Sequence, residues 1–240
     1  MSSIETFLQM VKESDNIVFF GGAGVSTESG IPDFRSVDGL YHQKYEYPQE
    51  KIVSNSFYVN HTEEFYRFYR DKMLCLTAKP NTTHYKLAEL EKAGKLKAVV
   101  TQNIDGLHQA AGSKNVLELH GSVHRNYCRK CGKEFDAEYI LNSKGVPVCD
   151  SCGGQIKPDV VLYEEGLNQQ TLEDAVYYIS HADMLIIGGT SLAVYPAAGL
   201  IDYYRGNKLV LINKSTTSMD SRADLLIQAG LGEVFGQVRV

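Results

Sequence analysis

The chain has 240 residues, of which 43% are hydrophobic and 22% are charged. These values are typical of globular proteins, and the length suits one large domain or one domain that carries inserts. No apolar stretch approaches the length of a membrane span and no signal-peptide pattern is present, so we expect a cytoplasmic protein without a membrane partner. The formal net charge of −5 argues against a nucleic-acid partner, because general nucleic-acid binders need a dense cationic face.

Hydrophobic periodicity predicts helices and strands in alternation. Residues 2–14 are amphipathic, and Ser2 and Glu5 are placed to form a capping box. A second helical pattern covers 85–94. Continuous apolar runs predict buried strands at 17–20, 98–100, 116–119, 184–187 and 209–212. Because these runs are not alternating and are separated by helical patterns, the sequence predicts an α/β fold with a parallel sheet covered on both faces.

Two segments interrupt this alternation. Residues 36–78 are rich in tyrosine and phenylalanine and become helical from about Thr62, and residues 121–157 carry four closely spaced cysteines. We expect both segments to be inserts that pack beside one another and form a cleft with the sheet domain. The sheet domain then comprises residues 1–35, 79–120 and 158–240.

The four cysteines predict a metal site. Cys128, Cys131, Cys149 and Cys152 form two C-x2-C pairs separated by seventeen residues. Four thiolates at this spacing favour one structural zinc ion in a closed tetrahedral site, so the chemistry must lie elsewhere. Two disulfides would need an oxidising compartment, and an iron–sulfur cluster stays open as an alternative. The fifth cysteine, Cys75, lies in an apolar run and is interpreted as a buried thiol.

The first predicted strand ends in a glycine-rich loop at 21–26. Gly22 and Gly24 match the first two glycines of a dinucleotide-binding fingerprint, but Thr27 stands where the third glycine is expected. Taken alone, such a loop is a simple turn about as often as it is a pyrophosphate site.

Polar residues also follow the other predicted strands. They are the segment 101–105 after the second strand, His120 and Gly121 after the third, 188–191 after the fourth and Asn213 after the fifth. In a parallel sheet these points share the carboxyl edge, where ligands bind. The convergence of five loops on one edge therefore predicts a binding site there.

Single residues at this edge have plainer interpretations. Asp33 and Arg35 could form a surface ion pair, and Asn103 and Asp105 could be turn residues. A lone histidine is more often structural than functional. We interpret His84, His108 and His124 in that way. His120 is the exception, because it ends a strand at the edge where the other loops meet.

Taken together, these residues resemble the sirtuin family of NAD-dependent protein lysine deacylases. The matching motifs are G-A-G-V-S-T-E-S-G-I-P-D-F-R (22–35), T-Q-N-I-D (101–105), H-G (120–121), the four cysteines, and G-T-S-L-x-V-x-P-A-A (189–198). They occur in the family's order and cover nearly the whole chain. The resemblance implies a Rossmann-like, doubly wound parallel sheet with an inserted zinc-binding module and a small helical module.

The resemblance also implies the reaction. Nicotinamide leaves the ribose of NAD, the carbonyl oxygen of an acyl-lysine attacks C1′, and water then gives lysine and O-acyl-ADP-ribose. His120 would act as general base on the ribose hydroxyls, since the reference pKa of histidine lies near neutral. Asn103 would orient the ribose or a water molecule.

On the residues that match the family's motifs, the resemblance implies two sets of contacts. NAD would be bound by Gly22, Ala23, Thr27, Glu28, Asp33, Phe34, Arg35, Gln102, Asn103, Ile104, Asp105, His120, Gly189, Thr190, Ser191, Asn213, Lys214 and Leu231. Within this set, Ile104 and Asp105 would hold the nicotinamide carboxamide. The acetylated substrate would add as a strand between 161–165 and 192–195, against Val161, Leu162, Tyr163, Glu164, Val194 and Tyr195.

The sequence departs from the family's pattern at the substrate side. Lys157 stands where arginine is usual, and Tyr163-Glu164-Glu165 stands where Phe-Gly-Glu is usual, so we expect Glu164 to favour basic residues near the target lysine. Succinyl-preferring members resemble one another in a tyrosine and an arginine three residues apart. Here Tyr66 is followed three residues later by Tyr69 and only then by Arg70, so we favour acetyl over succinyl.

The leading hypothesis is an NAD-dependent protein lysine deacetylase that acts as a monomer. A mono-ADP-ribosyltransferase, or a deacylase of other acyl-lysines, would use the same pocket. A non-catalytic NAD or acyl-lysine binding module is a third hypothesis, which the presence of His120 and Asn103 disfavours. A zinc-ribbon nucleic-acid binder is the fourth, disfavoured by the net charge of −5.

Overall fold

The computed structural model describes residues 2–33 and 46–239. Within these residues, six parallel strands form one sheet in the order β3-β2-β1-β7-β8-β9. The strands are β1 (Ile17–Gly21), β2 (Leu96–Thr101), β3 (Val116–Glu118), β7 (Met184–Gly188), β8 (Leu209–Ile212) and β9 (Leu225–Ile227). The strand order runs outward in one direction from β1 and in the other from β7. This is the doubly wound, Rossmann-like arrangement, and its switch point lies between these two strands.

The five predicted strands are confirmed, with ends that differ by no more than two residues. The sequence analysis missed β9, because three apolar residues between Asp224 and Gln228 are too short for a periodicity argument. Its residues pair in parallel with β8 and close that edge of the sheet.

Both faces of the sheet are covered, as the continuous apolar strands predicted. Alternate residues of each strand point to opposite faces, so Phe19 belongs to one core and Phe20 to the other. The first core is covered by α1 (Ser3–Glu13), α5 (Thr82–Lys92) and α9 (Leu231–Phe235). The second is covered by α8 (Gln169–His181) and the 3-10 helix η5 (Ala197–Tyr203). Each large apolar side chain that is fully buried contributes about 1.5–3 kcal/mol.

The first predicted helix is confirmed in detail. The Glu5 backbone N–H donates to Ser2 Oγ at 3.2 Å, and the Ser2 N–H donates to Glu5 Oε2 at 2.7 Å, which completes the capping box. The helix predicted over 85–94 begins three residues earlier, at Thr82. The reason is the cap residue Asn81, whose Oδ1 accepts from the Thr83 N–H at 3.0 Å.

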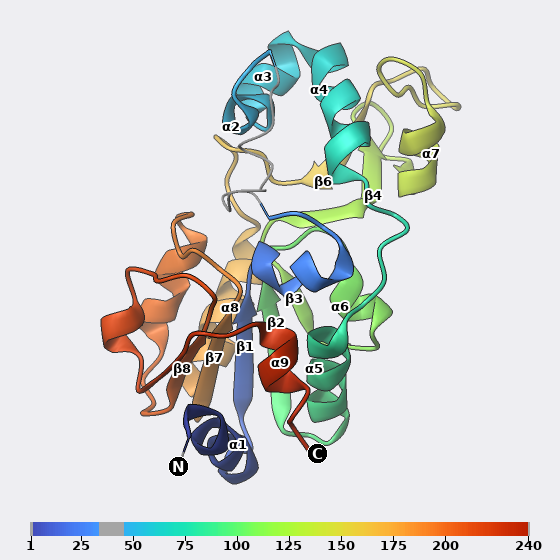
Figure 1. Ribbon diagram of the computed structural model, residues 1–240. Helices are drawn as coiled ribbons and strands as arrows, with labels where there is room; N and C mark the ends of the chain where they lie inside the picture. The colour runs from blue at the N-terminus through green and yellow to red at the C-terminus, as the bar shows by residue number, and fades with distance from the viewer. Residues whose placement is uncertain (1, 34–45, 240) are drawn as a thin grey trace.

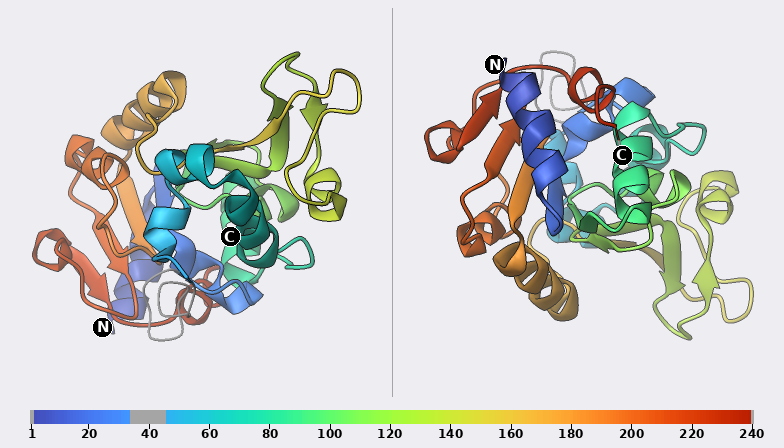
Figure 2. Two further views of the ribbon diagram at one scale, coloured as in Figure 1. Left: turned by 90° about the horizontal axis from the view of Figure 1, so that it is seen from above. Right: turned by 90° about the horizontal axis from the view of Figure 1, so that it is seen from below.

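The two inserts stand together above the carboxyl edge of the sheet (Figures 1 and 2). The helical module consists of α2 (Gln49–Ile52), α3 (Asn55–Asn60), α4 (Thr62–Phe68) and the π-helical turn η4 (Tyr69–Met73). The cysteine-bearing module consists of β4 (Gly121–Cys128), β5 (Glu134–Phe135), α7 (Ala137–Asn142) and β6 (Ile156–Val160). Its strands form a second, antiparallel sheet in the order β5-β4-β6. The domain limits stay a prediction; β6 runs across the limit expected between residues 157 and 158.

The two modules share one hydrophobic core, as expected for inserts that pack beside one another. Phe57, Phe65 and Tyr66 from the helical module are buried with Val123 and Ile156 from the other module. Polar contacts reinforce the packing, because the Tyr66 hydroxyl donates to the Ile156 carbonyl. The remaining short elements of the described residues are α6 (Leu107–Ala110), the 3-10 turn η6 (Asp220–Arg222) and the two turns after β1 discussed below. None of the helices in residues 2–33 and 46–239 has the length and hydropathy of a membrane span.

Two of the histidines interpreted as structural form a buried pair. His84 on α5 and His108 on α6 are 0% and 1% exposed, and their rings meet edge to face with centroids 4.7 Å apart. The Nδ1 atom of His84 accepts from the Asn81 backbone N–H at 3.2 Å. Burial lowers the pKa of His84 to about 4 and the pKa of His108 to about 3. Both imidazoles are therefore neutral in the folded protein at neutral pH.

We expect this pair to make the protein acid-sensitive. Below the ordinary histidine pKa of 6.5 the unfolded chain takes up two protons that the folded chain excludes until the pH nears 4 and 3. The free energy of unfolding should thus fall as the pH drops from about 6.5, by about 1.4 kcal/mol per pH unit for each histidine. Urea unfolding between about pH 7 and about pH 5 measures this slope.

The variant His108→Met should reduce the slope by about 1.4 kcal/mol per pH unit. His181→Gln, which changes an exposed histidine at the end of α8, is the matched control and should leave the slope unchanged. Because both variants keep every other titrating group, an equal slope in the two would contradict the assignment.

Candidate active site

The predicted convergence of loops is confirmed by the register of the sheet. Gly21 at the end of β1 pairs with Thr101 on one side and with Gly188 on the other. Thr101 pairs in turn with Glu118, and Gly188 with Ile212. The last residues of five parallel strands therefore form one row, and the loops that follow them meet above the switch point.

The glycines at this edge allow two loops to touch. The Gly24 N–H donates to the Gly189 carbonyl at 2.8 Å, and a Cβ on Gly24 would lie 2.7 Å from Gly189 Cα. A Cβ on Gly22 would lie 2.8 Å from Thr190 Cβ. Gly189 itself has a φ of 60°, which favours glycine. Glycine at these positions therefore lets the two loops lie in direct contact at the edge of the sheet.

The segment after β1 differs from the usual fingerprint. It forms two 3-10 turns, η1 (Ala23–Val25) and η2 (Thr27–Ser29), in place of the α-helix that commonly follows a dinucleotide loop. Thr27, at the position of the missing third glycine, donates from Oγ1 to the Gly24 carbonyl at 3.1 Å. The threonine therefore stabilises the turn instead of letting a helix pack closely.

Ser26 joins two of the expected site residues and was not identified from the sequence. Asn103 Nδ2 donates to Ser26 Oγ at 3.1 Å, and Ser26 Oγ donates to Asp105 Oδ2 at 2.6 Å. The other oxygen of Asp105 accepts from the Leu107 N–H at 2.9 Å. Ser26 is 1% exposed and Asn103 is 9% exposed. The network fixes the Asn103 amide and the Asp105 carboxylate beside the glycine-rich loops. The only sequence signal for Ser26 was its place inside the 22–35 motif.

His120 is held in one tautomer. Its Nδ1 lies 3.0 Å from the Gln102 carbonyl, which can only accept, so Nδ1 carries the proton and Nε2 carries the free electron pair. Burial lowers the pKa of His120, against a smaller opposing effect of the bond to Gln102. The ring is therefore neutral at neutral pH and presents a base at Nε2. Gln102 is fixed as well, because its Nε2 donates to Thr190 Oγ1 at 3.1 Å.

The residues expected on the adenosine side of NAD follow β7 and β8. Asn213 Nδ2 donates to the Thr190 carbonyl at 3.2 Å, and Ser191 and Lys214 are exposed beside it. Glu28 Oε1 accepts from the Gly232 N–H at 3.1 Å, which ties η2 to the start of α9.

Four other residues of the expected NAD set are buried to different degrees. Leu231 is 5% exposed and packs in the first core. Ala23 and Asp33 are half-buried. Ile104 is half-buried against the core of the inserts, and its carbonyl accepts from the Val123 N–H at 3.0 Å. Phe34 and Arg35 lie outside the described residues.

A groove of about 550 Å³ runs between the two expected walls of the substrate site. One wall carries Tyr163 and Glu164, and the other carries Ala193, Val194 and Tyr195. The groove is linked to His120, because the His120 carbonyl accepts from the Val161 N–H at 3.0 Å. Leu162 is buried behind the wall. The helical module adds lining residues that the sequence analysis missed: Glu50, Lys51, Ser54 and Ser56.

The four cysteines form a cluster that fits zinc. Their sulfur atoms all lie within 4.8 Å of one another, with 3.4 Å between Cys128 and Cys152 and 3.7 Å between Cys131 and Cys149. A tetrahedral zinc ion with bonds of about 2.3 Å needs sulfurs about 3.8 Å apart. Backbone N–H groups that face the sulfur lower the pKa of Cys128 to about 6, which favours the thiolate. The donor set has no open position for water, so the ion is structural.

Cys75 departs from the expectation of a buried thiol. It is half-buried, and its Sγ lies 3.8 Å from the Lys72 carbonyl. Burial nevertheless raises the pKa of this thiol, so it is not an activated nucleophile. It lies two residues after the end of the π-helical turn η4 at Met73.

Comparison with known proteins agrees with this geometry. A model of the Sir2 family matches residues 22–196. The NAD-dependent protein deacetylases of Clostridium acetobutylicum and Clostridium tetani are 61% and 59% identical, over 99% of this chain and 98% of each relative. A solved Sir2 structure with deacetylated p53 peptide and 3′-O-acetyl-ADP-ribose matches with a TM-score of 0.90 at 42% identity, over 97% of this chain and 96% of that one. A Sir2 complex with p53 peptide and NAD⁺ matches with a TM-score of 0.87 at 42% identity, over 99% and 97%.

Removal of one cysteine tests the metal site. We expect Cys149→Ser to lose most of its zinc and to melt at lower temperature, because the binding free energy of a structural ion is also folding free energy. Metal analysis after gel filtration should give about one zinc per wild-type chain and less than about half of that for the variant. Cys75→Ser is the matched control outside the cluster; equal zinc loss in both variants would rule out the site.

Proposed function

Because this chain belongs to the Sir2 family, we propose that it is an NAD-dependent protein lysine deacetylase that moves the acetyl group of acetyl-lysine to ADP-ribose and releases nicotinamide. One observation carries the proposal. His120 is bonded through Nδ1 to Gln102, beside the glycine loops, and through its carbonyl to Val161, beside the groove. A neutral base thus stands between a nucleotide-type site and a peptide-type site.

NAD fits the loops in both shape and chemistry. A Cβ on Gly22 or Gly24 would clash with the β7 loop, so this cradle exists only with glycine. When bound, NAD supplies the ADP-ribosyl group that receives the acetyl group. Asp105 and the backbone of Ile104 provide the acceptor and donor that a nicotinamide carboxamide needs.

Asn103 and His120 have separate roles in the proposed reaction. Asn103, fixed by Ser26, orients a hydroxyl or a water molecule at the reacting centre. His120 Nε2 accepts a proton from a ribose hydroxyl, while the Gln102 carbonyl stabilises the protonated ring through Nδ1–H.

The acetylated substrate is proposed to bind as an added strand in the groove. Main-chain groups of 161–165 and 192–195 other than those already bonded within the chain, such as the Tyr163 N–H and carbonyl, would give affinity through hydrogen bonds, with loose sequence preference. Tyr195 is 75% exposed at the rim of the groove and offers an apolar contact to residues near the target lysine.

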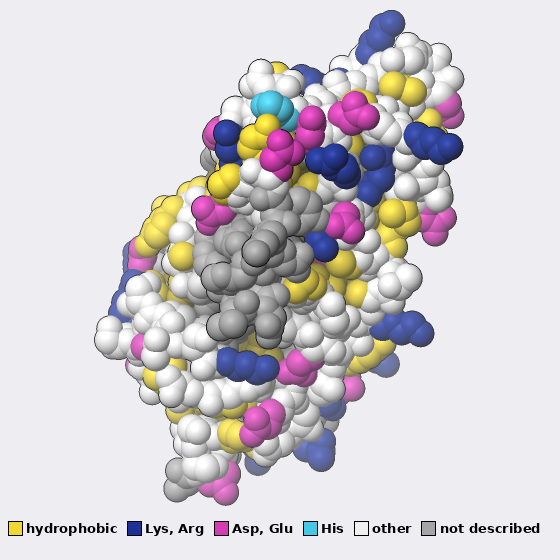
Figure 3. Space-filling model, turned by 45° about the horizontal axis from the view of Figure 1, so that its top comes forward, with side chains coloured by type: hydrophobic (Ala, Val, Ile, Leu, Met, Phe, Trp, Pro, Cys, Tyr) yellow, Lys and Arg dark blue, Asp and Glu magenta, His cyan; other side chains and the backbone are white. Residues whose placement is uncertain are grey.

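The proposed setting is cytoplasmic, with the chain acting as a monomer on protein substrates. The four cysteines suit zinc as free thiols, which agrees with a reducing compartment. On the face shown in Figure 3, acidic and basic side chains are interspersed and neither sign forms a continuous field, which supports the expectation of no nucleic-acid partner.

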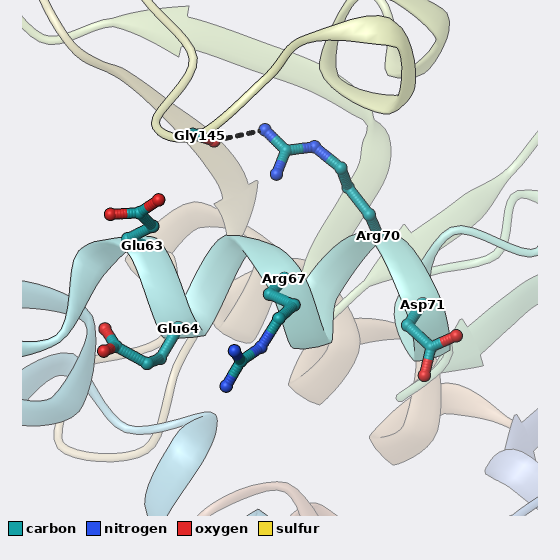
Figure 4. A pocket seen from close by; sticks show the side chains of 6 residues that line it. All are labelled: Glu63, Glu64, Arg67, Arg70, Asp71 and Gly145. Carbon is teal, nitrogen blue, oxygen red and sulfur yellow. Dashed lines mark hydrogen bonds between the residues drawn. The ribbon is translucent and has the colours of Figure 1, made fainter.

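Acetyl is proposed as the preferred acyl group. Arg70 is turned toward the cysteine-bearing module: it donates to the Ile140 carbonyl at 2.9 Å, to Ser143 Oγ at 2.7 Å and to the Gly145 carbonyl at 2.5 Å. Figure 4 shows it reaching to Gly145 and away from Arg67. A guanidinium that already holds three oxygens is not free to pair with the carboxylate of a succinyl group.

We therefore expect kcat/KM for an acetyl-lysine peptide to exceed that for the succinyl-lysine form of the same peptide by at least about tenfold. The measurement is nicotinamide release with the two matched peptides. Equal values, or a succinyl rate that collapses in Arg70→Gln while the acetyl rate is kept, would show that Arg70 does reach the acyl group.

The proposed function itself is tested by nicotinamide release from NAD with and without an acetyl-lysine peptide. Release should depend on the peptide and should fall by at least about 100-fold in His120→Ala, which removes the base. His181→Ala, an exposed histidine on α8, should keep the wild-type rate. Since burial holds the pKa of His120 below the ordinary 6.5, the acid limb of the kcat/KM profile should lie below that pH. Release without peptide would favour ADP-ribosyl transfer instead.

A further inference from the structure

Two residues at the groove or next to it have a backbone conformation that side chains other than glycine rarely adopt. In the part of the chain that the structure describes, Glu164 and Leu192 are the only non-glycine residues with positive φ, at 75° and 54°. Such a conformation persists only where surrounding contacts hold it. Leu192 is held by burial, because it is 4% exposed and its N–H donates to Thr190 Oγ1 at 3.2 Å. Glu164 is exposed, so a different contact must hold it.

That contact is made with Ser56 of the helical module. Glu164 Oε2 accepts from the Ser56 backbone N–H at 2.8 Å, and Glu164 Oε1 accepts from the Ser56 hydroxyl at 2.9 Å. Both oxygens of one carboxylate are therefore bound to one residue, which lies 108 positions earlier in the chain. Hydrogen bonds to an ionised carboxylate are about twice as strong as neutral ones.

Backbone bonds lie beside this contact. The Tyr163 N–H donates to the Val53 carbonyl at 3.0 Å, and the Tyr163 carbonyl accepts from the Asn55 N–H at 3.0 Å. Within the loop, Glu165 Oε2 accepts from the Leu162 N–H at 2.9 Å and from Lys157 Nζ at 3.1 Å. One wall of the groove is thus tied both to the helical module and to β6.

We propose that Glu164 is a positioning residue that fixes the helical module to this wall, so that the substrate groove is formed before the peptide arrives. The inference rests on the proposed deacetylase function and deepens it. The sequence analysis gave Glu164 a different role, the recognition of basic substrate residues. A carboxylate with both oxygens bound to Ser56 is poorly placed for that role.

If the groove is already formed, the loop at 161–165 and the helical module do not have to become ordered when the peptide binds, and this lowers the free-energy cost of binding. The benefit appears in substrate affinity and not in the chemical step, because Glu164 touches neither the glycine loops nor His120 in the described contacts. Loss of the contact should therefore raise the KM for peptide and leave kcat and the KM for NAD nearly unchanged.

The main test is Glu164→Gly. Glycine accepts the positive φ without strain, so the wall keeps its backbone path while both bonds to Ser56 are lost. Peptide KM should rise about tenfold, with kcat and the KM for NAD within about twofold of wild type. Glu164→Gln, which can still accept from the Ser56 N–H, should recover most of the loss. Adding Ser56→Ala to Glu164→Gly should raise KM little further, because the two residues share one contact.

The matched control is Glu63→Gln, which removes a carboxylate from α4 of the same module outside the groove and should leave peptide KM at its wild-type value. Two acetylated peptides, with neutral and with basic flanks, should respond equally to Glu164→Gly.

A peptide KM within about twofold of wild type in Glu164→Gly would overturn the proposal. So would a rise in Glu164→Gln confined to the basic peptide, since that result assigns Glu164 to charge recognition. Absence of peptide-dependent nicotinamide release in the wild type would instead sink the proposed function, and this inference with it.

Discussion

The contact between the loops that follow β1 and β7 is the constraint on which the site depends. Gly24 and Gly189 meet through a 2.8 Å backbone hydrogen bond at the switch point, with no room for a Cβ on either Gly22 or Gly24. The contact brings Thr190 over Gln102, whose side chain donates to the threonine and whose carbonyl accepts from His120. The position of the base therefore follows from the approach of two glycine loops.

Two hydrogen-bond networks hold the polar side chains at this edge of the sheet. Ser26 serves Asn103 and Asp105 through its hydroxyl, so the amide and the carboxylate cannot move independently. His120 belongs to a second network, through Gln102 and the backbone of Val161. Both networks include the loop that follows β2, because Gln102 belongs to one and Asn103 and Asp105 belong to the other. The base and the oriented amide are therefore fixed relative to each other through one short segment of backbone.

Much of this arrangement could be predicted from the sequence, because it depends on residue type and order. Apolar runs located the strands, and two C-x2-C pairs located the metal cluster. The contacts that finish the site could not be predicted in that way. Ser26 looks like any other residue of a glycine-rich motif until its side-chain direction is known. Glu164 and Ser56 are 108 residues apart, so their pairing depends on how the helical module packs. The motif at 22–35 also gave no sign that 3-10 turns replace the usual helix.

The hydrophobic core that the inserts share links the cysteine cluster to the groove. Cys128 and Cys149 are buried in the same cluster as Phe57 and Tyr58 of α3 and as Leu162 of the groove wall. Zinc closes the loop that carries the cysteines, so it stabilises the surface against which the helical module packs. The module in turn presents Ser56 to Glu164. The metal cluster therefore affects the groove only indirectly. The shape of the groove depends on how the two inserts pack and not on contact with the ion.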